Sequence, residues 1–278
     1  MKIADSGRAL KEILGKSAAP RVLVPTMGAL HKGHLQLIRQ ARQRAGPHGA
    51  VIVSLFVNPI QFDRPADLAA YPRPMEADLA ACEAEGVDVI FAPGAATMYY
   101  SDRSVTVTET SLSRHLCGAT RPGHFDGVCT VVLKLFLLSG CNIAVFGEKD
   151  FQQLAIIRRM VRDLDVPVEI IGCPTVREDD GLAMSSRNAR LTPTQRADAP
   201  RIRRSLVAAA AFSAPAEILQ AARSGIEASP LVRIDYLSLV DAQTLEPVTE
   251  MLRPAILATA VFYDGVRLID HIAVVSKI

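Results

Sequence analysis

The sequence predicts an α/β protein, with a parallel sheet in the first two thirds of the chain and a smaller α+β domain after it. Three observations lead to this prediction. Short apolar runs such as residues 50–57 alternate with stretches whose apolar residues recur at helical spacing. The apolar runs are nearly continuous, as in strands that helices cover on both faces. Beyond residue 176 the chain becomes polar, then rich in Ala and Arg, and finally strand-like.

The elements of the first part follow one another in a regular order. Strands are expected where β-branched and other apolar residues cluster, at residues 21–25, 50–57, 87–92, 142–146 and 168–172. Helices are expected between them, from residue 33 onward and over residues 75–86, 127–138 and 150–163. Alternating valines and polar residues predict a further edge strand at residues 104–109. Repeated strand–helix alternation of this kind indicates a parallel sheet.

The last third is predicted to form a smaller domain of its own. A polar stretch at residues 175–190 precedes an Ala- and Arg-rich helical region. Strands are expected at the end of the chain, at residues 233–240, 255–263 and 266–275, with an Asp264-Gly265 turn between the last two. We therefore expect two domains, residues 1–176 and residues 177–278.

Composition argues against several classes of protein. The 278 residues include 31 Lys and Arg against 29 Asp and Glu, a net charge of +2, and no Trp, which disfavours nucleic-acid binding. The apolar stretches are too short to span a bilayer, and the N-terminus lacks a signal-peptide core. Five cysteines without C-x-x-C spacing indicate thiols in a reducing compartment, not disulfides or a zinc site. We expect a soluble cytoplasmic protein that binds neither nucleic acid nor membrane.

The most informative motif is PTMGALHKGH, residues 25–34, between the first predicted strand and helix. His31 and His34 flank a glycine where the helix begins. Unpaired N–H groups and the helix dipole favour a phosphate at such a point, and Gly28 and Gly33 allow the backbone to approach a ligand closely. Neither a P-loop nor a dinucleotide fingerprint fits, because the required Lys-Ser/Thr and G-x-G-x-x-G are missing. The motif predicts a nucleoside triphosphate site.

Further polar motifs follow the other predicted strands, at the sheet edge where α/β folds bind ligands. N-P-I-Q-F follows residue 57, G-E-K-D-F-Q-Q follows residue 146, and C-P-T-V-R-E follows residue 172 and leads to G-L-A-M-S-S-R-N. R-P-G-H-F at residues 121–125 precedes a predicted helix. Together with PTMGALHKGH, these motifs resemble the pantothenate synthetase (pantoate–β-alanine ligase) family of the H-x-G-H nucleotidyltransferase superfamily. The resemblance runs from about residue 24 to residue 191.

The resemblance implies a Rossmann-like domain that binds ATP and pantoate, with a smaller C-terminal lid domain hinged near residues 176–180. The implied reaction condenses (R)-pantoate with β-alanine to pantothenate, through a pantoyl-adenylate, and releases AMP and pyrophosphate. Neither step needs a nucleophile from the protein, only positioning and charge stabilisation. ATP is the implied nucleotide substrate and Mg²⁺ its companion. A homodimer is also implied, for which the strand at residues 50–57 and its loop could supply an interface.

The family pattern assigns roles to particular residues of this chain. Implied catalytic residues are His31, His34, Lys149, Ser185, Ser186 and Arg187. Implied ATP-binding residues are Pro25, Thr26, Met27, Gly28, His31, Gly33, His34, Gly147, Lys149, Asp150, Pro174, Thr175, Val176, Met184, Ser185, Ser186 and Arg187. Implied pantoate-binding residues are Met27, Asn58, Gln61, Arg121 and Gln153. No direct metal ligand is expected, because ATP phosphates hold the Mg²⁺. Glu76 and Asp78 could contact the ion through water, but the default for both is a solvated helix N-terminus.

Three alternatives remain open on the residues alone. Another nucleotidyltransferase, one that adenylylates a phosphorylated acceptor, shares H-x-G-H but leaves the motifs after residues 57 and 146 unexplained. A class I aminoacyl-tRNA synthetase also shares it, but this chain has neither the room nor the basic surface for a tRNA-binding module. A nucleotide sensor without activity predicts the loss of Lys149 or of a histidine, and all three residues are present.

Overall fold

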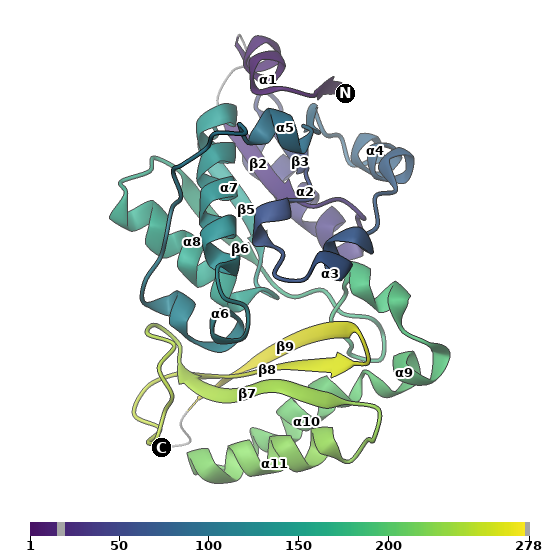
Figure 1. Cartoon of the computed structure of the whole chain (residues 1–278), viewed down its shortest axis with the longest axis vertical. Coiled ribbons are helices and arrows are strands. Elements are labelled where there is room, and N and C mark those ends of the chain that lie inside the picture. Colours follow the sequence, from purple (N-terminus) through teal and green to yellow (C-terminus); the bar gives the residue numbers. More distant parts are fainter. Residues whose placement is uncertain (16–19, 276–278) are drawn as a thin grey trace. The chain divides into compact units, whose positions relative to one another are not determined.

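The structure, a computed structural model, describes residues 1–15 and 20–275 and contains two compact units (Figure 1). Unit 1 comprises Met1–Glu109, Gly123–Glu148 and Ile156–Pro174, and unit 2 comprises Thr110–Pro122, Lys149–Ala155 and Thr175–Ile278. Two short segments that precede residue 176 in the sequence, 110–122 and 149–155, thus group with the C-terminal part of the chain.

Unit 1 is built on a six-stranded parallel sheet with the order β1-β4-β3-β2-β5-β6. Its strands are β1 (Lys2–Ala4), β2 (Arg21–Thr26), β3 (Ala50–Leu55), β4 (Val89–Phe91), β5 (Ile143–Gly147) and β6 (Glu169–Cys173). From β2 the chain moves outward through β3 and β4, then crosses back to β5 and β6. The direction of winding therefore reverses between β2 and β5, the point at which open α/β sheets bind ligands.

Helices cover this sheet because its strands are apolar on both faces. All six residues of β3 are buried. Helix α2 (Lys32–Ala45) packs Leu37, Ile38 and Ala41 into a core that includes residues of β2 to β5. Helix α7 (His124–Ser139) also packs on β2, and Figure 1 shows it in front of the sheet. The other helical segments of unit 1 are α1 (Gly7–Leu14), η1 (Pro59–Gln61), α3 (Pro65–Ala69), α4 (Met75–Ala84), α5 (Ala95–Met98) and most of α8 (Phe151–Asp163).

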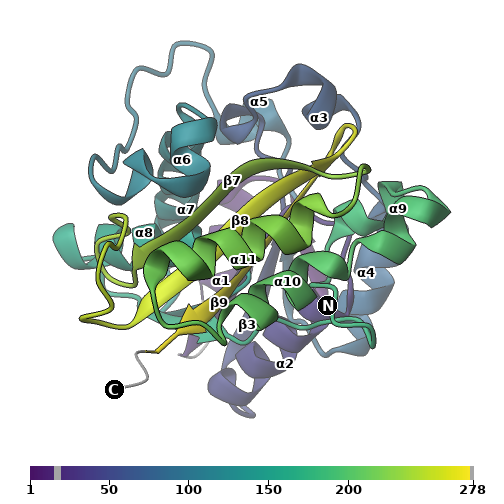
Figure 2. The same ribbon diagram turned by 90° about the horizontal axis from the view of Figure 1, so that it is seen from below.

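Unit 2 is an α+β structure on an antiparallel sheet of β7 (Arg233–Asp241), β8 (Ala255–Tyr263) and β9 (Val266–Val274). Helices α10 (Arg201–Ala209) and α11 (Pro215–Glu227) cover one face of this sheet, as Figure 2 shows. The core between them includes Leu206, Ile218 and Leu257. The remaining helical segments are η2 (Leu112–Arg114), α6 (Leu116–Thr120), η3 (Ser186–Arg190) and α9 (Pro193–Asp198).

The predicted fold class is confirmed, and one predicted element is wrong. Residues 104–109 form no strand in the described chain. The Val107 N–H donates to the hydroxyl of Thr130 on α7, 3.0 Å away, and Val105 is 78% exposed. Alternation of apolar and polar residues predicts a half-buried strand, but here the segment is mostly exposed and its contact with α7 replaces pairing with a neighbouring strand. The segments β1 and α1 were not predicted. For β1 the reason is its length, since it has only three residues and buries only Ala4.

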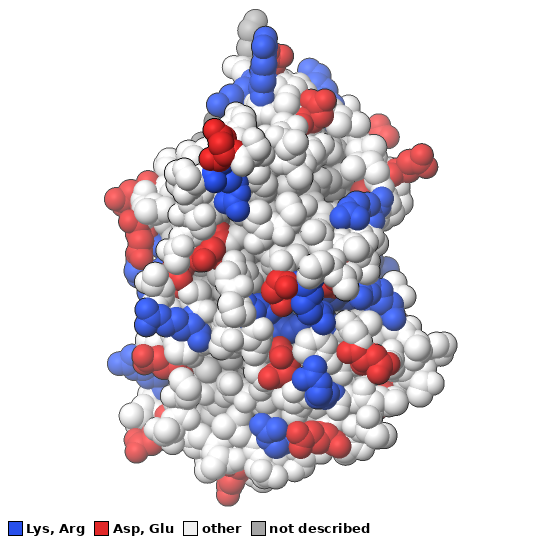
Figure 3. All heavy atoms as spheres, in the orientation of Figure 1, with Lys and Arg blue, Asp and Glu red and all other residues white. Residues whose placement is uncertain are grey.

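The surface carries no extended region of one charge on the face shown in Figure 3, where basic and acidic side chains are interspersed. This agrees with the near-balance of charges in the sequence. Among the described residues, no helix is both long enough and apolar enough to cross a membrane.

Candidate active site

The chain leaves β2 through a tight turn that is fixed from several sides. The Thr26 hydroxyl donates to the Ser54 carbonyl on β3 (2.7 Å) and accepts the N–H of Gly28 (3.1 Å). Gly28 and Ala29 then adopt left-handed conformations, with φ of 78° and 52°. Glycine tolerates this backbone freely, whereas a residue with a Cβ adopts it at an energetic cost. The turn is therefore a strained connection that other contacts must hold in place.

His31 and His34 form a capping box at the start of α2. The Nδ1 atom of His31, the N-cap residue, accepts the N–H of Gly33 (3.1 Å), and the Nδ1 atom of His34 accepts the N–H of His31 (3.3 Å). The two imidazole rings lie 4.1 Å apart. Because both Nδ1 atoms act as acceptors, each neutral ring carries its proton on Nε2. The motif thus places two imidazole rings beside a helix N-terminus, a setting that suits an anionic ligand.

Asp78 differs from its expected environment. It lies in the first turn of α4, but the residue is only 4% exposed. Its Oδ2 accepts the N–H of Ala29 and its Oδ1 accepts the N–H of Leu30, both at 2.8 Å. The expectation of a solvated carboxylate at a helix start is therefore wrong for Asp78, while Glu76 is exposed as expected.

A second group of polar residues surrounds Gln61 in unit 1. The Asn58 amide donates to Gln61 Oε1 (2.9 Å), and Gln61 Nε2 lies 3.3 Å from the sulfur of Met27. His124 Nδ1 donates to the Gln61 carbonyl (2.7 Å). A Cβ at Gly127 would lie 2.8 Å from the Gln61 nitrogen, so only glycine allows α7 to pack this closely on η1. The structure thus brings together three predicted pantoate-binding residues, Met27, Asn58 and Gln61.

Asn58 is the buried hydrogen-bond partner of Gln61 in this group. It is 1% exposed, and its amide also donates to the Gly127 carbonyl (3.1 Å). Its Oδ1 accepts the hydroxyl of Tyr99 (2.7 Å), and burial raises the pKa of that phenol to about 12. Tyr99 therefore stays a donor at neutral pH. These contacts fix the Asn58 amide, which in turn fixes the orientation of the Gln61 amide.

The predicted residues Gly147 and Pro174 lie at the ends of neighbouring strands. Gly147, the last residue of β5, pairs with Cys173 of β6, and the Glu148 N–H donates to the Cys173 carbonyl (2.8 Å). The chain then enters unit 2 at Lys149 and unit 1 ends at Pro174.

In unit 2, Lys149 interacts electrostatically with both acidic and basic side chains. Burial lowers the pKa of Lys149, the carboxylate of Asp150 opposes this effect, and the guanidinium of Arg187 adds to it. The side chain itself is half-buried. The structure therefore brings Lys149, Asp150 and Arg187, three predicted site residues, within electrostatic reach of one another.

The segment that carries the predicted Ser185-Ser186-Arg187 loop begins with a short hairpin. Its rungs are Met184 N–H to Val176 carbonyl (3.0 Å) and Glu178 N–H to Leu182 carbonyl (2.8 Å). Ser185 then caps η3 by accepting the Arg187 N–H on its hydroxyl (3.2 Å). The loop thus has a defined conformation that follows directly from the hairpin.

An ion pair ties the hairpin to the sheet of unit 2. Arg177 donates to both oxygens of Asp270 on β9, at 2.7 and 2.8 Å, and also to the Gly181 carbonyl (3.0 Å). The Asp270 side chain is 4% exposed and that of Arg177 is 21% exposed. This bidentate ion pair is shielded from water, so it is stronger than an exposed ion pair.

The predicted residues Arg121 and Gln153 lie in two segments that hydrogen bonds of Gln152 connect. The buried Gln152 amide donates to the carbonyls of Leu112 (2.8 Å) and His115 (2.7 Å) and accepts the N–H of Cys117 (2.9 Å). These three bonds join the first turn of α8 to the segment that ends in Arg121.

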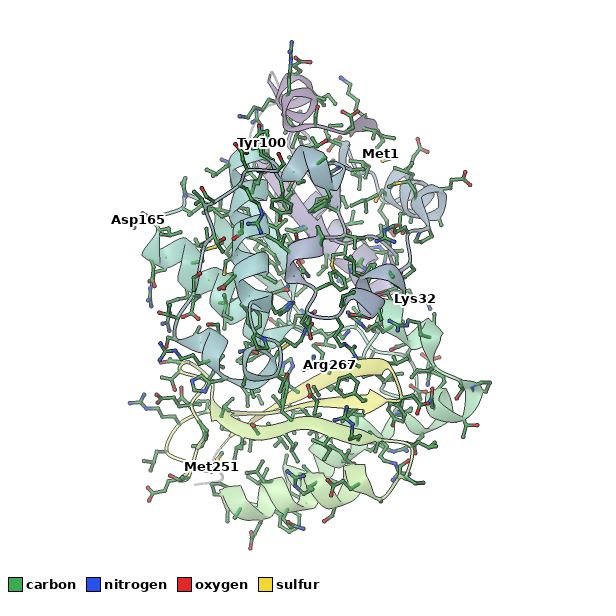
Figure 4. The ribbon with its side chains drawn as sticks, in the orientation of Figure 1. Met1, Lys32, Tyr100, Asp165, Met251 and Arg267 are labelled. Carbon is green, nitrogen blue, oxygen red and sulfur yellow. The ribbon has the colours of Figure 1, made fainter. Side chains whose placement is uncertain are left out.

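Arg267 of β9, labelled in Figure 4, fastens the same segment from the sheet. Its guanidinium donates to Thr120 (3.3 Å) and to Asp235 of β7 (2.8 Å) and approaches the Cys117 sulfur (3.6 Å). Among the described residues, no three His, Cys, Asp or Glu side chains are grouped so that they could hold a metal ion.

The sequence did not point to Tyr99, Gln152 or Asp270, nor to the contacts of Asp78. Gln152 alone stood within a recognised motif, G-E-K-D-F-Q-Q. The others lie outside the polar motifs that follow the strands, and only their burial and bonding in the structure reveal them.

Several known proteins are similar to this chain in sequence and in fold. The model of a family described as Pantoate-beta-alanine ligase matches residues 2–273. A pantothenate synthetase of Akkermansia muciniphila is 55% identical over 255 residues, which cover 90% of this chain and 91% of the relative. The crystal structure of pantothenate synthetase from Thermus thermophilus has a TM-score of 0.92 at 43% identity, covering 99% of this chain and 100% of that one. The structure of pantoate-beta-alanine ligase from Francisella tularensis, complexed with Beta-gamma ATP and Beta-alanine, has a TM-score of 0.83 at 33% identity, covering 98% and 97%.

Proposed function

Since this chain belongs to the pantoate–β-alanine ligase family, we propose that its residues condense (R)-pantoate with β-alanine in two steps, with cleavage of ATP to AMP and pyrophosphate. In the first step a pantoate carboxylate oxygen attacks the α-phosphorus, and the bond from that phosphorus to pyrophosphate breaks. In the second, the β-alanine amine attacks the acyl carbon of pantoyl-adenylate and AMP leaves. The amine loses a proton as the amide forms.

The His31–His34 capping box is the observation that carries the proposal. Two Nε2–H donors at a helix N-terminus suit the triphosphate and the negative charge that develops as pyrophosphate departs. The backbone of Pro25, Thr26, Met27, Gly28 and Gly33 lies in the same connection and completes this part of the ATP site.

Lys149 and the Ser185-Ser186-Arg187 loop are proposed to stabilise the charge on the phosphorus centre. Lysine and arginine neutralise phosphoryl oxygens, and serine hydroxyls donate to them. The electrostatic coupling of Lys149 with Arg187 supports a shared task. Loss of one such donor lowers a rate by roughly 10²–10³.

Asp150 is proposed to hold the ribose hydroxyls. The backbone around Gly147, Pro174, Thr175, Val176 and Met184 would contact the rest of the nucleotide. The nucleotide bound is proposed to be MgATP, with its metal held mainly by phosphate oxygens, as is usual for Mg²⁺ in nucleotide sites.

Gln61 and Gln153 are proposed to bind pantoate, because an amide can both donate to a carboxylate and accept from a hydroxyl. Met27 is proposed to contact pantoate as well, and Arg121 to contribute positive charge. Asn58 is proposed to act through Gln61, since its own amide is buried and engaged.

The wider setting is also part of the proposal. We propose a cytoplasmic homodimer, in which residues 177–278 act as a lid that protects the acyl-adenylate from water. Five free thiols, four of them buried, are compatible with a reducing compartment.

The test measures pyrophosphate and AMP release from ATP and Mg²⁺ while pantoate and β-alanine are omitted in turn. We expect multiple turnover only with both acids, and pyrophosphate at the level of one enzyme equivalent with pantoate alone. Lys149→Ala should fold normally but lose pyrophosphate release. Arg187→Ala should leak AMP when β-alanine is absent. If pantoate elicits no pyrophosphate under any condition, the proposal fails.

A further inference from the structure

Two backbone N–H groups in the turn that precedes H-x-G-H, those of Ala29 and Leu30, point to a carboxylate of the protein itself. Ala29 and Leu30 donate to the two oxygens of Asp78, each at 2.8 Å. Such N–H groups in a glycine-containing turn after a strand are often donors to a bound phosphate. In this turn an internal anion takes that position. The phosphate must then be bound by other donors, and the histidine rings follow the turn directly.

The turn needs such an anchor because its backbone is strained. Ala29 has φ of 52°, a left-handed conformation that costs a residue with a Cβ about 1–2 kcal/mol. A bond between a backbone N–H and a charged acceptor contributes about 1.5–3 kcal/mol. Two such bonds therefore more than offset the strain at Ala29.

The geometry around Gly28 leaves little freedom for this arrangement. A Cβ at Gly28 would lie 2.9 Å from Asp78 Oδ2, closer than real Cβ atoms approach. The residue with φ of 78° must therefore be a glycine both for its backbone angle and for the space that the carboxylate occupies. Asp78 and the turn are thus fitted to each other.

We propose that Asp78 is a positioning residue, which holds the Gly28-Ala29-Leu30 turn in its left-handed form and thereby places the His31 and His34 rings for the first chemical step. We expect Asp78 not to ligate Mg²⁺, because each of its oxygens accepts a backbone N–H and the residue is 4% exposed. This inference rests on the proposed function for its effect on rate, although not for the state of the turn.

The test compares Asp78→Asn with Glu76→Gln, which removes an exposed carboxylate from the same turn of α4. The Asn side chain keeps one acceptor but points an NH₂ group at a backbone N–H. A misplacement of about 1 Å can lower a rate by about 10²-fold, so we expect Asp78→Asn to reduce pantoate-dependent pyrophosphate release by about 10–100-fold. The Mg²⁺ concentration at half-maximal rate should be unchanged, and Glu76→Gln should match the wild type in both measurements.

A second variant separates positioning from a general loss of folding. Ala29→Gly removes the Cβ that makes the turn costly, so the rate lost through Asp78→Asn should be partly recovered in the double variant. A general folding defect would instead lower the melting temperature of Asp78→Asn without recovery by Ala29→Gly. That result would overturn the proposal, as would a wild-type rate for Asp78→Asn. A several-fold rise in the Mg²⁺ requirement, reversed by excess Mg²⁺, would overturn it in favour of a metal role.

Amide hydrogen exchange gives a readout that does not depend on activity. The N–H groups of Ala29 and Leu30 should exchange slowly in the wild type and in Glu76→Gln, and at least about 10-fold faster in Asp78→Asn, since the charge-assisted bonds that protect them are lost. If the wild type shows no ligase activity but this pattern is found, the proposed function fails and the anchoring role of Asp78 stands. If both amides exchange equally fast in all three proteins, Asp78 does not anchor the turn.

Discussion

The N–H of His31 donates to the Nδ1 atom of His34, so the second histidine of the motif caps the helix that the first one begins. The same contact fixes the proton of His34 on Nε2. One bond thus contributes both to the stability of α2 and to the chemistry of the motif, and suitable variants can separate the two.

His34→Gln should separate them. Glutamine is a usual partner at this position of a capping box, so the cap is kept while the ring donor is lost. We expect a melting temperature close to that of the wild type and a fall in pyrophosphate release of roughly 10²–10³, the effect of losing one charge-stabilising donor. His34→Ala should also lose the hydrogen bond from the His31 N–H, at a further cost of about 0.5–1.5 kcal/mol in the free energy of unfolding. Equal activity of His34→Gln and the wild type would remove the ring from the reaction.

Asn58→Ala should weaken pantoate binding although Asn58 is proposed to act only through Gln61. It leaves the Tyr99 hydroxyl, the Gly127 carbonyl and the Gln61 amide without their shared partner. Buried polar groups left in this way cost about 1–3 kcal/mol, so the free energy of unfolding should fall by about 2 kcal/mol. We expect the KM for pantoate to rise several-fold, since the Gln61 amide is no longer oriented, while the KM for ATP stays constant.

Tyr99→Phe is the matched control for Asn58. It removes one hydrogen bond to Asn58, worth about 0.5–1.5 kcal/mol, and leaves the bond from Asn58 to Gln61 in place. Steady-state kinetics should show a KM for pantoate close to that of the wild type. A rise in this KM as large as that of Asn58→Ala would show that general loosening, not the orientation of Gln61, is responsible.

The pH dependence of the reaction should reveal Lys149. Burial lowers the pKa of Lys149 below its ordinary value of 10.5, and the proposed role needs the protonated form. The kcat/KM for ATP, which reports the free enzyme, should therefore fall as pH rises through an apparent pKa below 10.5. Lys149→Arg should shift this alkaline limb upward, because arginine does not titrate in this range. An unchanged limb in Lys149→Arg would assign it to another group.

The same shift has a consequence for stability with a definite sign. Between the lowered pKa and 10.5, the unfolded chain binds more protons at Lys149 than the folded chain does. The contribution of Lys149 to the free energy of unfolding therefore rises with pH across that window. Urea unfolding of the wild type and of Lys149→Met at several pH values should check this. The free energy of unfolding of the wild type should rise relative to that of Lys149→Met as the pH increases across the window.

Asp270→Asn should lower the stability of unit 2 more than the loss of an exposed ion pair does. It removes the charge that compensates Arg177, and breaking a buried pair in this way costs about 3 kcal/mol. Asp180→Asn is the control, since the Asp180–Arg196 pair is substantially exposed and such pairs contribute about 0–1 kcal/mol. Hydrogen exchange of the hairpin amides at Glu178 and Met184 should accelerate in Asp270→Asn alone. Equal acceleration in the two variants would contradict a special role for the buried pair.

The sequence by itself determined those features that depend on neighbours along the chain. The strand at β2, the helix at α2 and the histidines at their junction follow from apolar spacing and from the break between two periodicities. Five motifs in a fixed order were enough to indicate the family, which the comparisons confirmed. The error at residues 104–109 shows the limit of such patterns, because alternation alone does not show that the apolar residues are buried: Val105 is 78% exposed.

Only the tertiary structure decided which distant residues support the site. Asp78 lies 49 residues from Ala29, Gly127 lies 69 residues from Asn58, and Asp270 lies 93 residues from Arg177. An aspartate in the first turn of a helix has the same local pattern whether it faces water or a strained turn. Its role is fixed by burial, which removes water as a competing partner and leaves the backbone N–H groups of Ala29 and Leu30 as its donors.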